Sequence, residues 1–393
     1  MRDDMDRRAI GTLSVGHGGV DFASGAIPAL IPFLVVEFDL GYAAAGALML
    51  ALTASSSLVQ PLFGYWSDSR GALWLLPGGL ALAAVGTALV ALAPAYPIVV
   101  AVTFAAGIGI AAYHPEGAKF AAYASSARRA SGMSLFNVGG NFGYALGPIV
   151  VTPLVLWLGL EGGALAAIPA LLVSFALVRA LPRLAVLRPS HEVARASAGE
   201  THAGAMAILA GVIALRSVAW FALLAFVPLW VVSQGGSEGA GNRELALMLI
   251  AGVVGTLLLG PIADRFGLRR TLLVTQALLP PLIIVFLELG GVVGTLALMA
   301  VGFCVVGTFG ITIVLSQLYL PHHTGMASGL SVGLAMGIGG VAAVALGAVA
   351  DSIDLETALV VAAIAPALGV GLCLLLPTPK RRVATEPALA QPA

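Results

Sequence analysis

The chain has 393 residues, of which 59% are hydrophobic and only 10% are charged, and its formal net charge is zero. A soluble globular domain carries about 25% charged residues, so this composition excludes a soluble protein and gives no basis for a nucleic-acid partner. We therefore expect the lipid bilayer to be the solvent for most of the chain.

Apolar runs long enough to cross a membrane, each of about 20 residues, follow a short charged start. The first run is too long for a cleavable signal peptide and is expected to act as an uncleaved targeting signal. Cys304 and Cys373 lie in separate apolar runs, so neither a disulfide nor a metal site is predicted. The sequence predicts an all-α membrane protein with twelve transmembrane helices, at 10–36, 43–66, 73–93, 97–122, 131–157, 163–181, 205–232, 245–263, 271–288, 292–319, 325–350 and 357–376.

The longest hydrophilic stretch, 182–204, follows the sixth run. We interpret it as a linker between two six-helix bundles, 1–181 and 205–380, with a tail at 381–393. If the N-terminus is inside, 17 of the 19 basic residues lie in inside segments, against Arg243 outside and Arg216 within a run. Basic residues favour the cytoplasmic side. This predicts a bacterial inner-membrane protein, expected as a monomer, with both termini and the linker in the cytoplasm.

Two short connections half a chain apart have nearly the same sequence. Gly64-Tyr65-Trp66-Ser67-Asp68-Ser69-Arg70-Gly71 returns 196 positions later as Gly260-Pro261-Ile262-Ala263-Asp264-Arg265-Phe266-Gly267-Leu268-Arg269-Arg270. A second match, at an offset of 197, joins Ser131-Gly132-Met133-Ser134 to Ser328-Gly329-Leu330-Ser331. The halves are therefore predicted to be parallel pseudo-repeats of six helices, as in membrane carriers.

This pattern resembles the major facilitator superfamily. The second connection is close to that family's loop motif, whereas the first keeps the acid but lacks the basic tail. In the family the acid caps a neighbouring helix and latches the halves on the cytoplasmic side. The resemblance implies this role for Asp68 and Asp264, with Arg70, Arg265 and Arg269 as the basic members of the motif.

A narrower resemblance is to the fosmidomycin resistance protein group of that superfamily, and it implies proton-driven drug export without fixing the substrate. The matching strings are His17-x-x-x-Asp21, Gln60-Pro61-Leu62-Phe63-Gly64, Tyr113-His114-Pro115-Glu116-Gly117-Ala118, Met133-Ser134-Leu135-Phe136-x-x-Gly139-Gly140-Asn141 and Leu215-Arg216-Ser217. In the same way, Gly143-x-x-x-Gly147-Pro148 resembles an antiporter-associated motif.

Charged side chains inside a membrane are costly and usually face a cavity with a function. Asp21 lies roughly 16 Å into the first predicted span, near the midplane, with His17 one turn earlier on the same face. Burial disfavours a charged carboxylate, so such a group can exchange protons near neutral pH. We interpret Asp21 as a proton-coupling residue modulated by His17, and the alternative is a structural ion pair.

Arg216 lies near the midplane of the seventh predicted span and does not deprotonate in proteins. It is therefore expected to meet an anion, which is Asp21, Glu116 or an anionic substrate, unless it forms a fixed structural pair. Trp220, one turn later, is a candidate aromatic wall for the substrate, although core packing is the default interpretation.

Glu116 is predicted near the cytoplasmic end of the fourth span, where Pro115 can kink the helix. His114 and Glu116 are candidates for a proton exit or gate, against an interfacial acid beside Lys119. Asn137 and Asn141, one turn apart in the fifth span, are candidates for the substrate cavity or for helix packing.

On these grounds we expect proton-coupled efflux of a small molecule, which needs no cofactor because a proton gradient supplies the energy. A proton-coupled uptake symporter for an organic anion and a lipid-handling carrier are the alternatives. An enzyme is not expected, because the Gly329-Leu330-Ser331-Val332-Gly333 string falls in an apolar helical run and not in a strand–turn–helix. No phosphate-binding loop is present, so an ATP-driven pump is not predicted either.

Overall fold

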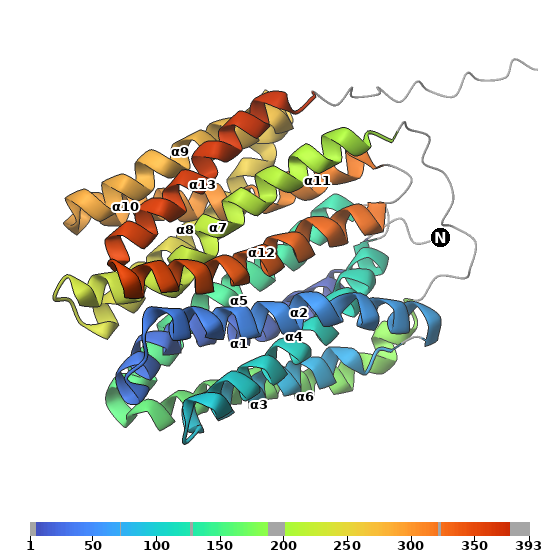
Figure 1. The fold of residues 1–393 in the computed structure, drawn as a ribbon. Helices are drawn as coiled ribbons and strands as arrows, with labels where there is room; N and C mark the ends of the chain where they lie inside the picture. The colour runs from blue at the N-terminus through green and yellow to red at the C-terminus, as the bar shows by residue number, and fades with distance from the viewer. Residues whose placement is uncertain (1–4, 71, 126–128, 188–200, 321–323, 378–393) are drawn as a thin grey trace, which may run out of the picture.

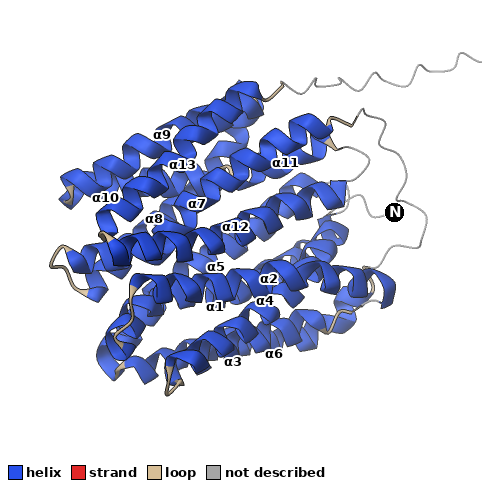
Figure 2. Cartoon of the chain, viewed as in Figure 1, coloured by secondary structure: helices blue, strands red, loops and turns tan. Residues whose placement is uncertain are grey.

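The computed structural model describes residues 5–70, 72–125, 129–187, 201–320 and 324–377. Within these ranges the chain is helical and has no strand (Figure 2). Twelve candidate membrane spans are present, which confirms the predicted fold class. The elements are α1 (Arg7–Phe38), α2 (Tyr42–Arg70), α3 (Leu75–Leu92), α4 (Tyr96–Ser125), α5 (Arg129–Leu158), η2 (Leu160–Ala166), α6 (Ala167–Ala185), α7 (Ala203–Ser233), α8 (Glu238–Phe266), α9 (Leu268–Leu289), α10 (Gly291–Gly307), α11 (Phe309–Tyr319), α12 (Thr324–Ser352) and α13 (Leu355–Leu375).

The tenth span departs from the continuous helix predicted at 292–319. It is divided at Thr308 into α10 and α11. The hydroxyl of Thr308 is directed back to the carbonyl oxygens of Cys304 (2.8 Å) and Val305 (3.0 Å). A discontinuous helix in a membrane bundle exposes backbone groups that a functional site can use.

Local sequence fixes where several helices begin and turn. Asp6 caps α1, since its Oδ1 accepts the backbone N–H groups of Arg8 (3.1 Å) and Ala9 (3.0 Å). Asp354 caps α13 in the same way, through the Thr357 N–H at 2.7 Å. Gly290 forms the corner between α9 and α10 with a positive φ of 54°, a conformation that glycine adopts without steric cost.

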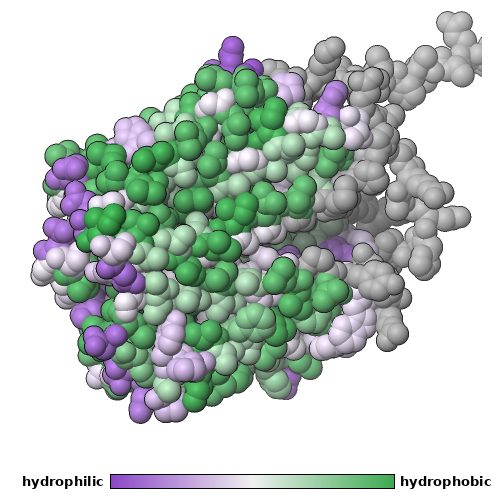
Figure 3. Space-filling model, viewed as in Figure 1, coloured by the Kyte–Doolittle hydropathy of each residue, from purple (hydrophilic) through white to green (hydrophobic). Residues whose placement is uncertain are grey.

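The helices form two halves, α1–α6 and α7–α13, which lie one below the other in Figure 1. Successive spans alternate in direction, so one end of the bundle carries Arg7, Arg183, Arg265 and Arg269, and the other carries Asp39, Asp351 and Asp354. We call these the arginine-rich end and the acidic end. The space-filling view shows an apolar belt between them (Figure 3).

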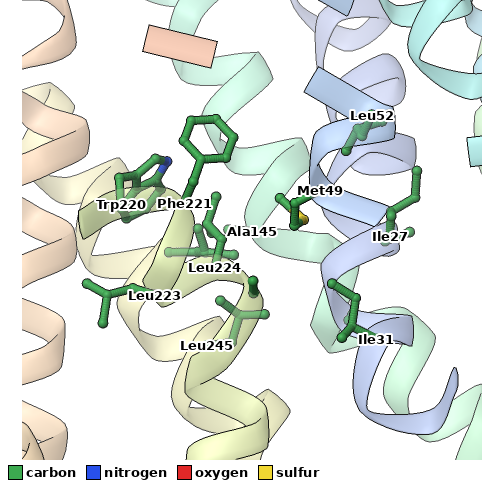
Figure 4. Packing of buried hydrophobic residues seen from close by; sticks show 14 of the residues in the cluster. Ile27, Ile31, Met49, Leu52, Ala145, Trp220, Phe221, Leu223, Leu224 and Leu245 are labelled. Carbon is green, nitrogen blue, oxygen red and sulfur yellow. The ribbon is translucent and has the colours of Figure 1, made fainter. Parts of the chain in front are cut away.

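The halves meet mainly along α2 with α12 and α5 with α8. Glycines allow the backbones to touch near the acidic end: Gly46 lies against Ala343, and Gly347 lies against Tyr42 and Ala43. In Figure 4, apolar side chains of α1 and α2, such as Ile27 and Met49, and those of α7 and α8 belong to one buried cluster. A separate cluster fills the arginine-rich end of the second half. The surface recedes between the halves toward that end (Figure 3).

Within the first half, α1 and α5 are joined by a glycine seam made of Gly18, Gly25, Gly143 and Gly147. A Cβ at Gly143 would collide with the Gly18 carbonyl, and one at Gly147 would collide with the Gly25 backbone. Small residues allow this backbone contact, which drives helix association in membranes through packing. The seam therefore holds α1 and α5 as one unit.

Candidate functional site

Three titratable side chains from two helices meet inside the first half. Asp21 on α1 lies between His17 on the same helix and His114 on α4: its carboxylate oxygens are 3.3 Å from Nε2 of His17 and 3.2 Å from Nε2 of His114. The side chains are 8% exposed for His17, 17% for Asp21 and 26% for His114. We call these three residues the His–Asp–His cluster.

The other ring nitrogen of each histidine is held by a backbone carbonyl. His17 Nδ1 lies 2.8 Å from the Phe136 oxygen on α5, and His114 Nδ1 lies 2.8 Å from the Ile110 oxygen one turn earlier. A carbonyl only accepts hydrogen bonds, so each Nδ1 carries a hydrogen and donates it. Both Nε2 atoms therefore lie toward Asp21 without a hydrogen of their own. A hydrogen bond between either Nε2 atom and the carboxylate needs one additional proton.

The surroundings of the cluster are closely fitted. His17 stacks on Phe136 with ring centroids 4.0 Å apart, and a Cβ at Gly140 would lie 2.5 Å from His17 and 2.6 Å from Asp21. The Tyr113 hydroxyl donates to the Leu13 carbonyl at 2.9 Å and so joins α4 to α1. Sequence reasoning missed the role of Tyr113, although its place beside His114 was a signal.

The structure separates the two members of the predicted gate. His114 joins Asp21, whereas Glu116 points elsewhere on α4 and pairs with Lys119, with its Oε2 2.8 Å from Nζ. Glu116 is completely buried, so it is not a solvated acid even though Lys119 is its partner. Glu116 and His114 thus belong to different polar groups.

A second polar group lies in the other half. Arg216 on α7 is 1% exposed, and its Nη1 donates to Oγ1 of Thr308 at 2.7 Å, at the break between α10 and α11. Its guanidinium lies 4.9 Å from the ring centroid of Phe309, and Trp220 packs edge-on to the same ring at 6.4 Å. Within the described ranges, Arg216 has no ion pair and its Nε has no hydrogen-bond partner. The Thr308 contact was not predicted, because no proline marks the break.

The two predicted asparagines differ in their surroundings. Asn141 Nδ2 donates to Oγ1 of Thr256 on α8 at 2.9 Å and so joins the halves. Asn137, one turn earlier on α5, is half-buried. Near the acidic end, Asn242 on α8 also crosses between halves and donates to the Ala29 carbonyl at 2.8 Å.

Asp351, at the end of α12, forms another contact between the halves. Its Oδ1 accepts the Tyr42 N–H at 2.6 Å, and its Oδ2 accepts the Ala43 N–H at 2.8 Å. These are the first amides of α2, where the helix dipole favours an anion. No local sequence pattern predicts this contact, because its partner comes from the other half of the chain.

The repeated loop motif lies at the arginine-rich end. Asp264 and Arg265 are exposed at the end of α8, and Arg265 lies over the Phe266 ring. Arg269 donates to the carbonyls of Leu374 (2.6 Å) and Cys373 (3.4 Å) at the end of α13, within its own half. The side chains of Asp68 and Arg70 lie outside the described residues, so the predicted latch between Asp68 and a neighbouring helix stays a prediction.

The His–Asp–His cluster is also the group of described residues that could hold a metal ion, since one ligand atom of each residue lies within 4.8 Å of the others. Imidazoles whose second nitrogen donates to a carbonyl are usual among metal ligands. The same geometry suits proton sharing, and the expectation of no metal stays a prediction.

Comparison with known proteins gives concordant results. The model of the Major Facilitator Superfamily matches residues 13–343. An uncharacterized MFS-type transporter, YfnC of Bacillus subtilis (strain 168), is 32% identical over 379 residues, which are 94% of this chain and 92% of that protein. The fosmidomycin resistance protein of Escherichia coli (strain K12) is 30% identical over 377 residues, with the same coverage of 94% and 92%.

Solved structures share the fold at low sequence identity. A bacterial homolog of the human lysosomal transporter Spinster, in an inward-facing and unoccupied conformation, has a TM-score of 0.74 and 14% identity, covering 94% of this chain and 96% of that one. The xylose transporter XylE from E. coli, in a partially occluded inward-open conformation, has a TM-score of 0.70 and 15% identity, covering 93% and 98%.

Proposed function

Because the chain belongs to the major facilitator superfamily of membrane transporters, we propose that it is a proton-coupled antiporter that exports a small organic molecule by alternating access. The observation that carries this proposal is the His–Asp–His cluster, which suits proton binding. The name of the E. coli relative, the fosmidomycin resistance protein, supports export of a drug.

The cluster is suited to gain and lose a proton as one unit. When both Nε2 atoms carry a proton, the Asp21 carboxylate lies between two imidazolium rings and the cluster has one net positive charge. Loss of one proton makes it neutral while one charge-assisted hydrogen bond is kept. A buried site that alternates between these two states can couple proton movement to the orientation of the halves, with Asp21 as the central residue.

The arrangement of the halves supports alternating access. The Asp351 contacts to α2, the Asn242 contact to α1 and the glycine contacts of α2 with α12 close the acidic end. The recess opens toward the arginine-rich end, which we assign to the cytoplasm of a bacterial inner membrane from the distribution of arginines. The chain would bind its cargo from the cytoplasm in this state and expose it outside once the acidic end opens.

Proteoliposomes that contain a pH-sensitive dye test the proposal. The ligand is first selected by thermal shift from a panel of phosphonates and cationic drugs that includes fosmidomycin. An antiporter moves protons out as the added ligand enters, so the vesicle interior becomes alkaline, whereas a symporter acidifies it. Asp21→Asn should abolish the pH change, and Glu161→Gln, an exposed acid at the acidic end, should leave it intact. A full response from Asp21→Asn would overturn the proposal.

Arg216 supports a second candidate, an uptake symporter for an organic anion. A buried arginine without a counter-charge is costly, and an anionic group of the substrate would satisfy it. Acidification of the vesicles on addition of an anionic ligand, lost in Arg216→Gln, would favour this candidate. Trp220, Asn137 and Asn141 would then be tested as further substrate contacts.

A further inference from the structure

A long groove runs along the outside of the second half between α8 and α9, with α10 as its floor. Its volume is about 780 Å³. We call it the α8–α9 groove. It is lined by Ala251, Leu259, Ile262 and Phe266 of α8, by Arg270, Thr271, Val274, Thr275, Leu278 and Leu282 of α9, and by Met299, Ala300, Phe303 and Cys304 of α10.

The walls of the α8–α9 groove suit an apolar occupant. Apart from Arg270, its polar side chains are Thr271 and Thr275, whose hydroxyls donate to carbonyls of their own helix, Gly267 at 3.1 Å and Thr271 at 2.9 Å. No unsatisfied hydrogen-bonding group among these wall residues is therefore directed at an occupant. The rim is also apolar, since Phe266 and Val274 are more than half exposed.

The length and position of the groove match one leaflet of a bilayer. From Arg270 to Leu282 the helix rises about 18 Å, and half of a bilayer's hydrocarbon core is about 15 Å. The groove begins at the arginine-rich end, and all of its lining residues belong to α8, α9 and α10 of the second half. Its occupant therefore comes from the surrounding membrane, from the leaflet at that end.

The positively charged side chain of Arg270 lies at the mouth of the groove. Arg270 is exposed and has no hydrogen bond or ion pair with another residue in the described ranges. Its neighbour Arg269 differs, because it is held by the carbonyls of α13. We propose that the α8–α9 groove binds a phospholipid with an anionic headgroup, with the headgroup phosphate at Arg270 and one acyl chain along the apolar walls.

Native mass spectrometry of the detergent-purified protein, with added phosphatidylglycerol or phosphatidylcholine, tests this site. We expect the wild type to retain phosphatidylglycerol more strongly, and Arg270→Gln to reduce that retention about fivefold, the usual effect of one basic residue on an anionic lipid. Arg179→Gln is the matched control, because Arg179 is an exposed arginine that lies over Phe175 on α6, in the other half. It should leave retention unchanged.

A groove-filling variant, Ala300→Phe, separates the acyl chain from the headgroup. It should reduce the retention of both lipids, since it occupies the floor and leaves Arg270 in place. Equal retention by wild type and Arg270→Gln, equal losses in Arg270→Gln and Arg179→Gln, or unchanged retention in Ala300→Phe would each overturn the proposal. The readout is binding alone, so it does not depend on the direction or coupling of transport.

Discussion

The carboxylate of Asp351 accepts the backbone N–H of Tyr42 at 2.6 Å, although 309 positions separate the two residues. Together with the Ala43 N–H, this contact places a negative charge at the positive end of α2 and fastens the second half to the first. Asp351 thus caps a helix at the acidic end, which is the role that the loop motif predicts for Asp68 at the arginine-rich end.

Replacement of Asp351 should loosen the acidic end. Asp351→Asn removes the charge and leaves only one acceptor, which should weaken the contact by about 1 kcal/mol and raise the open fraction about fivefold. The measurement is the rate of thiol labelling at Met49→Cys, a position buried between the halves in Figure 4. Asp354→Asn is the control, because Asp354 caps a helix within its own half. Equal labelling rates in both variants would contradict a latch at Asp351.

The two histidines of the His–Asp–His cluster should not be equivalent. His17 is stacked on Phe136 and held by α5, whereas His114 is the more exposed member. We expect His114→Gln to keep ligand binding but to lower proton movement per ligand, because Gln can donate a hydrogen bond but does not titrate. Asp21→Asn should reduce coupled transport at least tenfold. Parallel measurement of ligand flux and vesicle pH distinguishes these losses, and an unchanged proton-to-ligand ratio in His114→Gln would exclude its role.

Arg216 should lower the stability of the fold and at the same time be required for transport. An uncompensated buried charge is costly, so Arg216→Met, of similar shape, should be neutral or stabilising by about 1–4 kcal/mol. Transport of an anionic ligand should be lost. Thermal unfolding in detergent and ligand binding measure the two effects, with the exposed Arg243→Met as control. A marked fall in Tm would show instead that Arg216 is a structural residue.

Asp6 should stabilise the first half in a pH-dependent way. The hydrogen bond from the Ala9 amide, and then the Arg183 guanidinium at 2.9 Å, hold the pKa of Asp6 below its ordinary value, although partial burial opposes them. A lowered carboxyl pKa in the folded state stabilises the fold above the unfolded pKa of about 3.9, and this stabilisation is lost as the pH falls through the folded value. Asp6→Ala should therefore cost about 1 kcal/mol at pH 7.

The same variant should match the wild type more closely as the pH approaches 3, which thermal unfolding at several pH values can follow. Arg183→Gln provides the comparison, since it removes only an exposed ion pair worth a few tenths of a kcal/mol. A constant difference between Asp6→Ala and wild type across the pH range would contradict the titration of Asp6 as its cause.

The sequence predicts features that depend on neighbours along the chain. Twelve apolar spans and the shared face of His17 and Asp21 follow from helical length and period. His114 could not be placed beside Asp21, because their contact depends on how α4 crosses α1. The partner of Asp351 could not be predicted for the same reason, since a contact between the two halves leaves no pattern in the sequence around either residue.

The glycine seam between α1 and α5 has a consequence for how this protein can change over evolutionary time. A methyl group at Gly143 would force α1 and α5 apart and displace the backbone that carries Asp21. Mutations that adapt the chain to new cargo therefore cannot accumulate along this seam without disturbing the His–Asp–His cluster. Adaptation to a new cargo is left to positions away from such glycine contacts, in either half.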